Sequence, residues 1–306
     1  MRSAAAALPL ELNIRDNARV TSSERPVARS VSYAPIAARY ERVRGGFARA
    51  AELSTGVLPW LPAGVILDVG AGTGIVSQRL RAGQPSIGDG SGEPAGDSSG
   101  SWTDGSDART DAPTVRRVVG VDLSIEMLGQ ARSRLPGCLA VADATHLPLA
   151  AGSVDAVVYV WVLHHIGDID AALREAKRVL RPRGRVVAVS GLSEPAGDDM
   201  APIFERLSAT LRPNMGRRAG AVVPAARLVG FTPIHEGTVR TSRGMSPNEL
   251  ANAIEQRLFS QLWDTSEEAW AAVVAPAVKA LRALPRPDRR RRRVFDHPLV
   301  VLDRGP

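Results

Sequence analysis

The chain has 306 residues, of which 44% are hydrophobic, and its formal net charge is +7. No apolar run approaches the roughly 20 residues that a helix needs to cross a bilayer, and the short AAAALPL stretch at the N-terminus is followed too soon by charge for a secretory signal. The lone cysteine, Cys138, excludes an intrachain disulfide and a cysteine-rich metal site. We therefore expect a cytoplasmic protein without membrane association.

The first part of the chain changes from an irregular leader to helices and then to a strand. Residues 1–30 lack periodicity and are expected to be disordered. Helical spacing follows over residues 31–61, with Tyr33 and Tyr40 on one face of the first helix and Phe47 in the second. The β-branched run VILDV, residues 65–69, is typical of a strand that is buried on both faces.

A low-complexity insert separates this strand from the next. A helix is expected from about Gly74 to Arg81, after which residues 83–114 break all periodicity. These 32 residues contain seven Gly, six Ser, three Pro and six acidic residues against one arginine. Such a segment buries too little apolar area to offset the entropy of ordering it, so we expect a disordered loop.

Strands and helices then alternate. Strands are expected over residues 116–122, 138–143, 154–162 and 184–191, with a helix capped by Ser124 and a second over residues 168–182 that ends at Pro182. Repeated strand and helix alternation predicts an α/β fold with a parallel sheet.

The last third gives weaker signals. A helix over residues 219–229 that ends at Gly230 precedes a strand near Val239, and residues 246–284 are expected to form two or more helices before a final strand over residues 297–303. We interpret residues 31–306 as one domain in which 246–284 is a helical insertion, a possible lid. The arginine run 289–293 is expected to be a solvated loop or tail, with a contact to phosphate or to an acidic partner as the alternative.

The motif LDVGAGTG, residues 67–74, lies where the first buried strand passes into a helix. Gly70, Gly72 and Gly74 allow a tight turn and let a ligand lie against bare backbone. The nicotinamide fingerprint G-x-G-x-x-G/A would need a small residue where Ile75 stands. The preceding Asp68 also suits a cationic ligand better than a pyrophosphate.

A second acidic residue tests for nucleoside binding. An acid that accepts both ribose hydroxyls is expected about 20 residues beyond the glycines, at the end of the next strand. Asp122 stands 52 residues after Gly70, and removal of the 32-residue insert brings this spacing to 20. The sequence therefore predicts a nucleoside site, provided that the insert bulges out between the first helix and the second strand.

Together these segments resemble the class I S-adenosylmethionine-dependent methyltransferases, in particular the small-molecule group that includes the ubiquinone and menaquinone methyltransferases. The resemblance runs from about Tyr33 to Leu192 and rests on four motifs in order: VILDVGAGTG, VVGVDLSIEML, VADATHLPLAAGSVDAVVYVWVLHHI and LREAKRVLRPRGRVVAVS. It implies a Rossmann-like fold with a mostly parallel, seven-stranded sheet and helices on both faces.

The resemblance also implies a role for each matching residue. Asp68 would hold the amino group of the cofactor, and Asp122 would hold its ribose. The backbone of the glycine-rich turn would line the methionine part, the following residues would pack near the adenine or accept its amino group, the end of the fourth strand would face the sulfonium, and an N-terminal helix would close over the cofactor. The residues for the methionine part are Gly70, Ala71, Gly72 and Gly74, and those for the adenine are Leu123, Met127, Asp143 and Ala144. Val160 and Trp161 would face the sulfonium, and Tyr33 and Tyr40 lie in the N-terminal helix.

Two histidines follow the fourth strand. His164 or His165 could act as a general base near the acceptor, although the LHHI string occurs in this family whatever the substrate. The other histidines, His146, His235 and His297, are isolated in sequence, so no metal site is expected.

We expect an enzyme that transfers a methyl group from S-adenosylmethionine to a small-molecule metabolite, acting as a monomer or homodimer. Two alternatives stay open: an RNA acceptor, suggested by the arginine run, and a non-catalytic module that only binds the cofactor. In-line methyl transfer needs alignment more than it needs a particular base, so the sequence indicates the donor and leaves the acceptor open.

Overall fold

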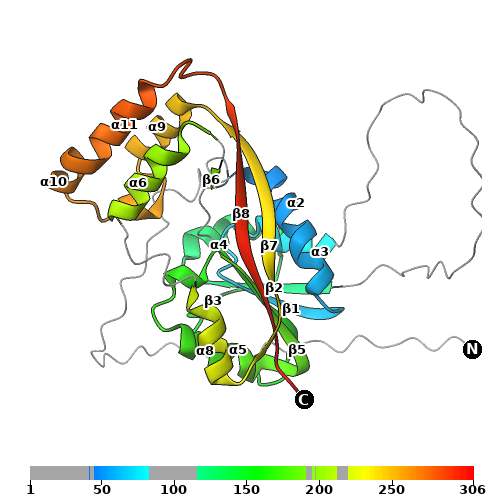
Figure 1. Ribbon diagram of the computed structural model, residues 1–306. Coiled ribbons are helices and arrows are strands. Elements are labelled where there is room, and N and C mark those ends of the chain that lie inside the picture. The colour runs from blue at the N-terminus through cyan, green and yellow to red at the C-terminus, as the bar shows by residue number, and fades with distance from the viewer. Residues whose placement is uncertain (1–40, 42–44, 83–115, 191–194, 197, 212–219) are drawn as a thin grey trace, which may run out of the picture.

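The computed structural model describes residues 41, 45–82, 116–190, 195–196, 198–211 and 220–306. The predictions for Tyr33, Tyr40, the leader 1–30 and the insert 83–114 lie outside these residues. Within the described part, a single twisted sheet forms the centre of the molecule (Figure 1).

The sheet has the strand order β3-β2-β1-β4-β5-β8, with β7 paired to the other side of β8. The pairs β3–β2, β2–β1, β1–β4 and β4–β5 are parallel, whereas β8 is antiparallel to both β5 and β7. The strands are β1 (Gly64–Val69), β2 (Arg116–Asp122), β3 (Leu139–Val141), β4 (Val154–Val160), β5 (Leu180–Val189), β7 (Thr232–Met245) and β8 (Arg291–Asp303). A two-residue strand, β6 (Pro195–Ala196), also pairs with β8. The expected Rossmann-like, mostly parallel sheet is thus confirmed, with β6 as an addition.

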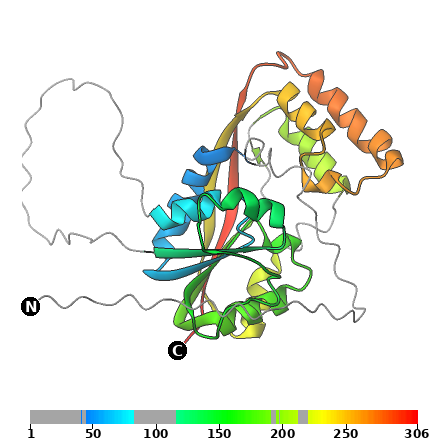
Figure 2. The ribbon, with the colours of Figure 1, turned by 180° about the vertical axis from the view of Figure 1, so that it is seen from behind.

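Helices cover both faces of the sheet (Figures 1 and 2). On one face, α2 (Gly46–Val57) and α3 (Ile75–Ala82) pack on β-branched residues of the central strands, including Ile66, Val158 and Val187. On the other face lie α5 (Ile169–Val179) and α8 (Val222–Val229). Because both faces are covered there, the central strands β1, β2 and β4 are mostly apolar and buried, as the sequence indicates.

The ends of the helices follow local chemistry. Ser124 caps α4 (Ile125–Ala131), where its hydroxyl accepts a hydrogen bond from the backbone N–H of Met127 at 3.2 Å, and Gly230 ends α8 in a left-handed conformation. The expected helix 168–182 is too long, because α5 ends at Val179 and the chain enters β5 at once. Pro182 lies in the stretch where the β4–β5 register shifts, so its missing N–H removes no bond to β4.

Strands β7 and β8 extend beyond the rest of the sheet and carry a separate group of helices, which we call the helical lobe (Figures 1 and 2). The lobe consists of α6 (Ala201–Leu211), α9 (Pro247–Glu255), α10 (Glu267–Ala269) and α11 (Ala275–Arg282), with the short turns η3 (Ser260–Leu262) and η4 (Trp270–Val274). It has its own apolar core, which includes Leu250, Ile254 and Leu281. In the described part of the chain, no helix is both long and apolar enough to cross a membrane.

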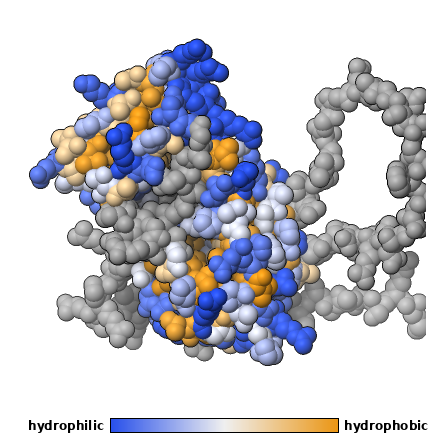
Figure 3. Space-filling model, in the orientation of Figure 1, coloured by the Kyte–Doolittle hydropathy of each residue, from blue (hydrophilic) through white to orange (hydrophobic). Residues whose placement is uncertain are grey.

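The arginine run differs from the expected solvated loop. Figure 3 shows hydrophilic residues over much of the upper surface of the helical lobe. Arg289 and Arg290 are exposed just before β8, but the next three arginines belong to β8 itself. Side chains alternate along a strand, so Arg291 and Arg293 share a face, where they form ion pairs with Asp199 and Asp198. The acidic partners of these two arginines therefore include carboxylates of the same chain, which residue spacing cannot reveal.

Candidate functional site

The glycine-rich turn connects β1 to α3 at the carboxyl edge of the sheet. The backbone N–H groups of Gly70 and Ala71 donate to the carbonyl oxygen of Val121 in β2, at 2.8 and 3.0 Å. Gly70 has a φ of 75°, and a Cβ atom there would lie 2.4 Å from a methyl carbon of Val162. Only glycine therefore allows this turn to lie against the end of β4.

Asp122 ends β2 beside the glycine-rich turn. Its Oδ2 accepts from the backbone N–H of Gly72 at 2.9 Å, and its Oδ1 accepts from that of Ser124 at 2.9 Å. Burial raises the pKa of this carboxyl, while the two backbone donors oppose the rise. A carboxylate has about four lone-pair positions, so this one can accept further hydrogen bonds from a ligand.

Asp68 lies in β1 and is almost completely buried. Its Oδ2 accepts a hydrogen bond from the hydroxyl of Ser77 in α3. Burial raises the pKa of Asp68 to about 6, and the charge of Asp122 adds to the rise, whereas the Ser77 hydrogen bond opposes it. A cationic ligand would favour the ionised form of this carboxyl.

A cleft of about 550 Å³ opens between the glycine-rich turn, the end of β4 and α2. The predicted residues that line it are Asp68, Gly70, Ala71, Gly72, Val160 and Trp161. Thr73, also in the lining, is 2% exposed, and its hydroxyl has no hydrogen-bond partner among the described residues. Gly74 is not in the lining; it packs on Ala131 of α4 and starts α3.

The residues expected near the adenine lie beyond Asp122. Leu123 is 57% exposed, so its side chain can cover a ligand, and the terminal carbon of Met127 lies near Gly72. Asp143 is exposed, and its Oδ1 accepts from both the N–H and the hydroxyl of Thr145, while Ala144 beside it is buried.

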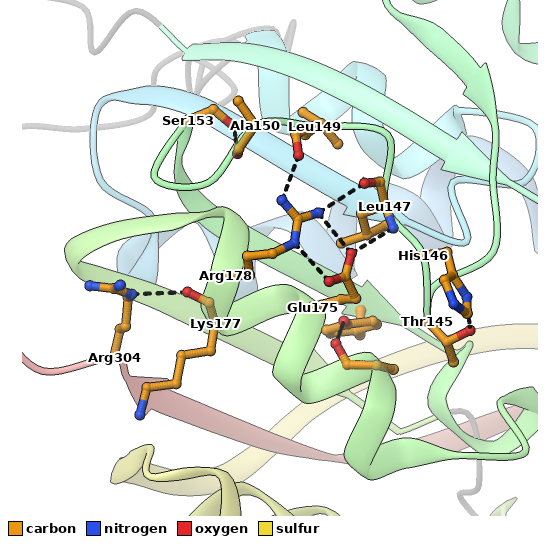
Figure 4. Close-up of polar contacts among 12 residues, drawn as sticks. Thr145, His146, Leu147, Leu149, Ala150, Ser153, Glu175, Lys177, Arg178 and Arg304 are labelled. Atoms are coloured by element: carbon orange, nitrogen blue, oxygen red, sulfur yellow. Dashed lines mark hydrogen bonds and ion pairs between the residues drawn. The ribbon is translucent and has the colours of Figure 1, made fainter. Parts of the chain in front are cut away.

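The loop after Asp143 is fixed by two side chains of α5 (Figure 4). Arg178 donates to the carbonyl oxygens of Leu147 and Leu149 at 2.9 and 2.8 Å, and Glu175 accepts from the N–H of Leu147 at 2.8 Å. Arg178 and Glu175 also pair with each other, which lowers the pKa of Glu175. The loop that carries Asp143 and Ala144 is therefore held by α5.

The two histidines after β4, His164 and His165, lie outside the lining of the cleft. They lie in the turn η2 (Leu163–His165), and their rings contact each other with centroids 3.9 Å apart. Neither lines the cleft. His164 lines a separate cavity of about 380 Å³, which lies among Leu163, Ala188, Ser190, Val222, Pro298 and Val300.

Sequence reasoning missed a polar cluster at the same end of the molecule. Arg49 of α2 lines the cleft, and its guanidinium donates to the Thr241 hydroxyl at 3.3 Å and to Nε2 of His297 at 3.1 Å. These residues are 192 and 248 positions from Arg49 in sequence. Only the α2 position over β7 and β8 brings them together, so no local signal could have found them.

Comparisons with known proteins agree with this geometry. The family model described as a methyltransferase domain matches residues 101–188, which begin after the glycine-rich turn. The ubiquinone/menaquinone biosynthesis C-methyltransferase of Rubrivivax gelatinosus is 40% identical over 103 residues, which cover 33% of this chain and 40% of that protein. A 37.1 kDa uncharacterised protein of transposon TN4556 from Streptomyces fradiae is 44% identical over 88 residues, which cover 28% of this chain and 24% of that protein.

Among solved structures, a candidate methyltransferase of Bacillus halodurans superposes with a TM-score of 0.50 at 15% identity, covering 84% of this chain and 99% of that one. The sheet order, the glycine-rich turn and this likeness define the class I methyltransferase fold. Residues 101–188 match a methyltransferase domain, and the aligned segment is similar to a ubiquinone/menaquinone biosynthesis C-methyltransferase. The chain spans less than half the length of the curated relatives described above.

Proposed function

We propose that this protein transfers a methyl group from S-adenosylmethionine to a small-molecule acceptor. The observation that carries the proposal is the position of Asp122, whose carboxylate is fixed by Gly72 and Ser124 beside the cleft. Asp122 would hold the ribose hydroxyls, and Asp68 would hold the amino group of the methionine part. The bare backbone from Gly70 to Gly72 would let that part lie close to the turn.

The residues present fit this cofactor. The cleft offers the buried carboxyl of Asp68 for an ammonium group and the Thr73 hydroxyl, without a partner among the described residues, for a further polar contact. Asp122, hydrogen-bonded to Gly72 of the lining, offers an acceptor for hydroxyls beside it. Leu123, Met127, Asp143 and Ala144 would surround the adenine. When bound, the sulfonium supplies a methyl group whose departure leaves a neutral thioether. The protein's part is to align the acceptor with the methyl group and to exclude water, and alignment alone is worth about 7 to 11 kcal/mol.

Of the two candidate bases, His164 lines the separate cavity near the ends of β4 and β5, and because neither histidine lines the cleft, a base role for either stays a prediction. Acceptors with weakly acidic groups would need such a base. We propose that the reaction takes place in the cytoplasm and that residues 246–284, which belong to the helical lobe, act as a lid within one domain. An RNA acceptor has less support than a small-molecule acceptor, because Arg290, Arg291 and Arg293 pair with carboxylates of the chain itself.

Isothermal titration with S-adenosylmethionine and its demethylated product, followed by a methyl-transfer assay on metabolite acceptors, tests this proposal. We expect both forms to bind and at least one small acceptor to be methylated. Failure of both forms to bind would contradict the proposal. Binding without turnover on any acceptor would favour the non-catalytic alternative.

A further inference from the structure

Strand β4 divides the sheet into two halves. The end of β2 with Asp122 and the strand β1 with Asp68 lie on one side of β4, whereas β5, β8 and β7 lie on the other. Trp161 follows β4 directly, at the boundary between these halves. If the cofactor occupies the side of Asp122 and Asp68, as the proposed function requires, the acceptor must approach from the side of β5 and β8.

Arg49 belongs to the acceptor side. Its side chain comes from α2, is 6% exposed as part of the cleft lining and donates to Thr241 of β7 and His297 of β8. His297 in turn lies 3.2 Å from the carbonyl oxygen of Ser190, through Nδ1. Burial, with the charge of Arg49 as a second cause, lowers the pKa of His297 to about 3. The histidine is therefore neutral, and its Nε2 can accept from the guanidinium, which keeps its own charge.

Trp161 stands against this cation. The central carbon of the Arg49 guanidinium lies 4.0 Å from the indole centroid, and the His297 ring lies 5.2 Å away on a tilt. The indole N–H is buried and has no hydrogen-bond partner among the described residues. The backbone of Trp161 has a φ of 58°, an unusual conformation for a bulky residue that persists only where its surroundings enforce it. This part of the cleft lining thus combines the Trp161 indole ring, the Arg49 guanidinium and an indole N–H that has no acceptor among the described residues.

We propose that Arg49 and Trp161 recognise a carboxylate on the methyl acceptor, so that the acceptor is an organic acid. A carboxylate is the complementary group for a buried guanidinium, and charge-assisted hydrogen bonds of this kind are about twice as strong as neutral ones. A second oxygen of the same group can accept from the indole N–H. His297 and Thr241 act as positioning residues, because they orient the guanidinium and do not line the cleft. This inference rests on the proposed function, since Arg49 and Trp161 line the same cleft as Asp68 and the glycine-rich turn.

The test uses the full chain saturated with the demethylated cofactor, S-adenosylhomocysteine. A panel of aromatic and aliphatic carboxylic acids is titrated, each paired with its carboxamide, which has the same shape without the charge. We expect carboxylates to bind about tenfold or more tightly than their amides. Arg49→Gln should abolish this difference, Arg49→Lys should keep part of it, and Trp161→Phe, which retains a ring and removes the N–H, should reduce it.

The outcomes separate this inference from the function on which it rests. If S-adenosylhomocysteine does not bind the wild-type protein, the proposed function fails first, and the inference falls with it. If it binds but no carboxylate is preferred over its amide, only the acceptor assignment is wrong. A loss of S-adenosylhomocysteine affinity in Arg49→Gln, of about tenfold or more, would place Arg49 in the cofactor half and overturn the assignment. If Arg49→Gln does not fold, Arg49→Lys and Trp161→Phe give the decision by the same comparison.

Discussion

Arg293 and Asp198 form an ion pair whose side chains are only 1% and 2% exposed, with Nε and Oδ2 2.7 Å apart. The pair joins β8 to the segment that enters α6, so it ties the helical lobe to the sheet. Asp198 also accepts from the N–H of Met200 at 2.8 Å through its other oxygen. The helical lobe is thus anchored to the sheet by an ion pair that is buried from water.

Removal of one partner of this pair should strongly destabilise the protein. Asp198→Asn keeps the acceptor for Met200 but leaves the Arg293 guanidinium buried without that counter-charge, which we expect to cost about 3 to 5 kcal/mol. The matched control is Asp296→Asn, which breaks the exposed pair with Arg240 and should change stability far less, because solvent screens an exposed pair. Urea unfolding measures both. Equal losses in the two variants would show that burial of the first pair does not matter.

Because burial raises the pKa of Asp68, the cofactor-free protein is more stable when this carboxyl is neutral than when it is ionised. The folded pKa of about 6 lies above the ordinary aspartate value of 3.8, so between these pH values the folded state binds a proton that the unfolded state has lost. Stability from this group is therefore present below about pH 4 and declines as pH rises towards 6, by about 3 kcal/mol in total. Asp68→Asn, which still offers Ser77 an acceptor, should stabilise the cofactor-free protein at pH 7 and weaken cofactor binding.

Urea unfolding of wild type and Asp68→Asn between pH 5 and 7.5 checks this prediction. The gain from the substitution should shrink as pH falls through 6, because the wild-type carboxyl becomes neutral there. Parallel stability curves for the two proteins across this range would contradict the assignment of a raised pKa to Asp68.

His297 has the opposite pH dependence. Its folded pKa of about 3 lies below the ordinary 6.5, so the unfolded state takes up a proton that the folded state refuses. Stability from the neutral ring is present above pH 6.5 and is lost as pH falls, by about 2 kcal/mol between pH 6.5 and 5. His297→Gln should remove this loss, although it lowers stability at pH 7.5. The control is His146→Gln, an exposed histidine, which should leave the slope between pH 7.5 and 5 as in wild type; a wild-type slope in His297→Gln would be the contrary result.

Arg178 should matter for the adenine side of the cleft. Arg178→Met removes the bonds to the Leu147 and Leu149 carbonyl oxygens that hold the loop after Asp143, so we expect a loss of about 1 to 3 kcal/mol in stability and weaker cofactor binding. Lys177→Met is the control on the same helix, because its amine bonds instead to the carbonyl oxygens of Val229 and Gly230. Both variants should lose stability, but only Arg178→Met should bind the cofactor more weakly in titration calorimetry. Equal cofactor affinities in the two would argue against a role for this loop.

Local pattern was enough to predict the parallel core of the fold. Buried β-branched strands, the Ser124 cap and the Gly230 stop each depend on neighbours within a few residues, and all appear as expected. Asp122 lies beside the glycine-rich turn, where its spacing from the glycines predicts it once the insert is set aside, and its role toward a ribose stays a prediction. The predicted end of the helix at Pro182 was wrong, because Leu180 already pairs with Val154 of β4 and the chain enters β5 before Pro182.

Long-range contacts were beyond the sequence. His297 has no metal-ligand spacing and was treated as isolated, yet it contacts Arg49 from the far end of the chain. Arg293 belongs to the arginine run 289–293, which the sequence predicts to be solvated as a whole. Its partner, Asp198, is 95 positions away, so the sequence does not reveal the buried pair. Asp198 follows β6, whose pairing with β8 brings it near Arg293, whereas Arg49 meets His297 because α2 packs over β7 and β8. Neither contact has a local signature in the sequence.

The central claim is that Asp122 holds the ribose of the cofactor, and one calorimetric titration tests it most directly. Asp122→Ala is compared with Asp155→Ala, because Asp155 also accepts a backbone N–H, that of Val65 at 2.7 Å, but at the opposite edge of the same sheet. With S-adenosylhomocysteine as ligand, we expect Asp122→Ala to lose about 30- to 100-fold in affinity, as for the loss of hydrogen bonds to a charged group, and Asp155→Ala to bind as wild type. Unchanged affinity in Asp122→Ala, with the variant shown to be folded, would contradict the account.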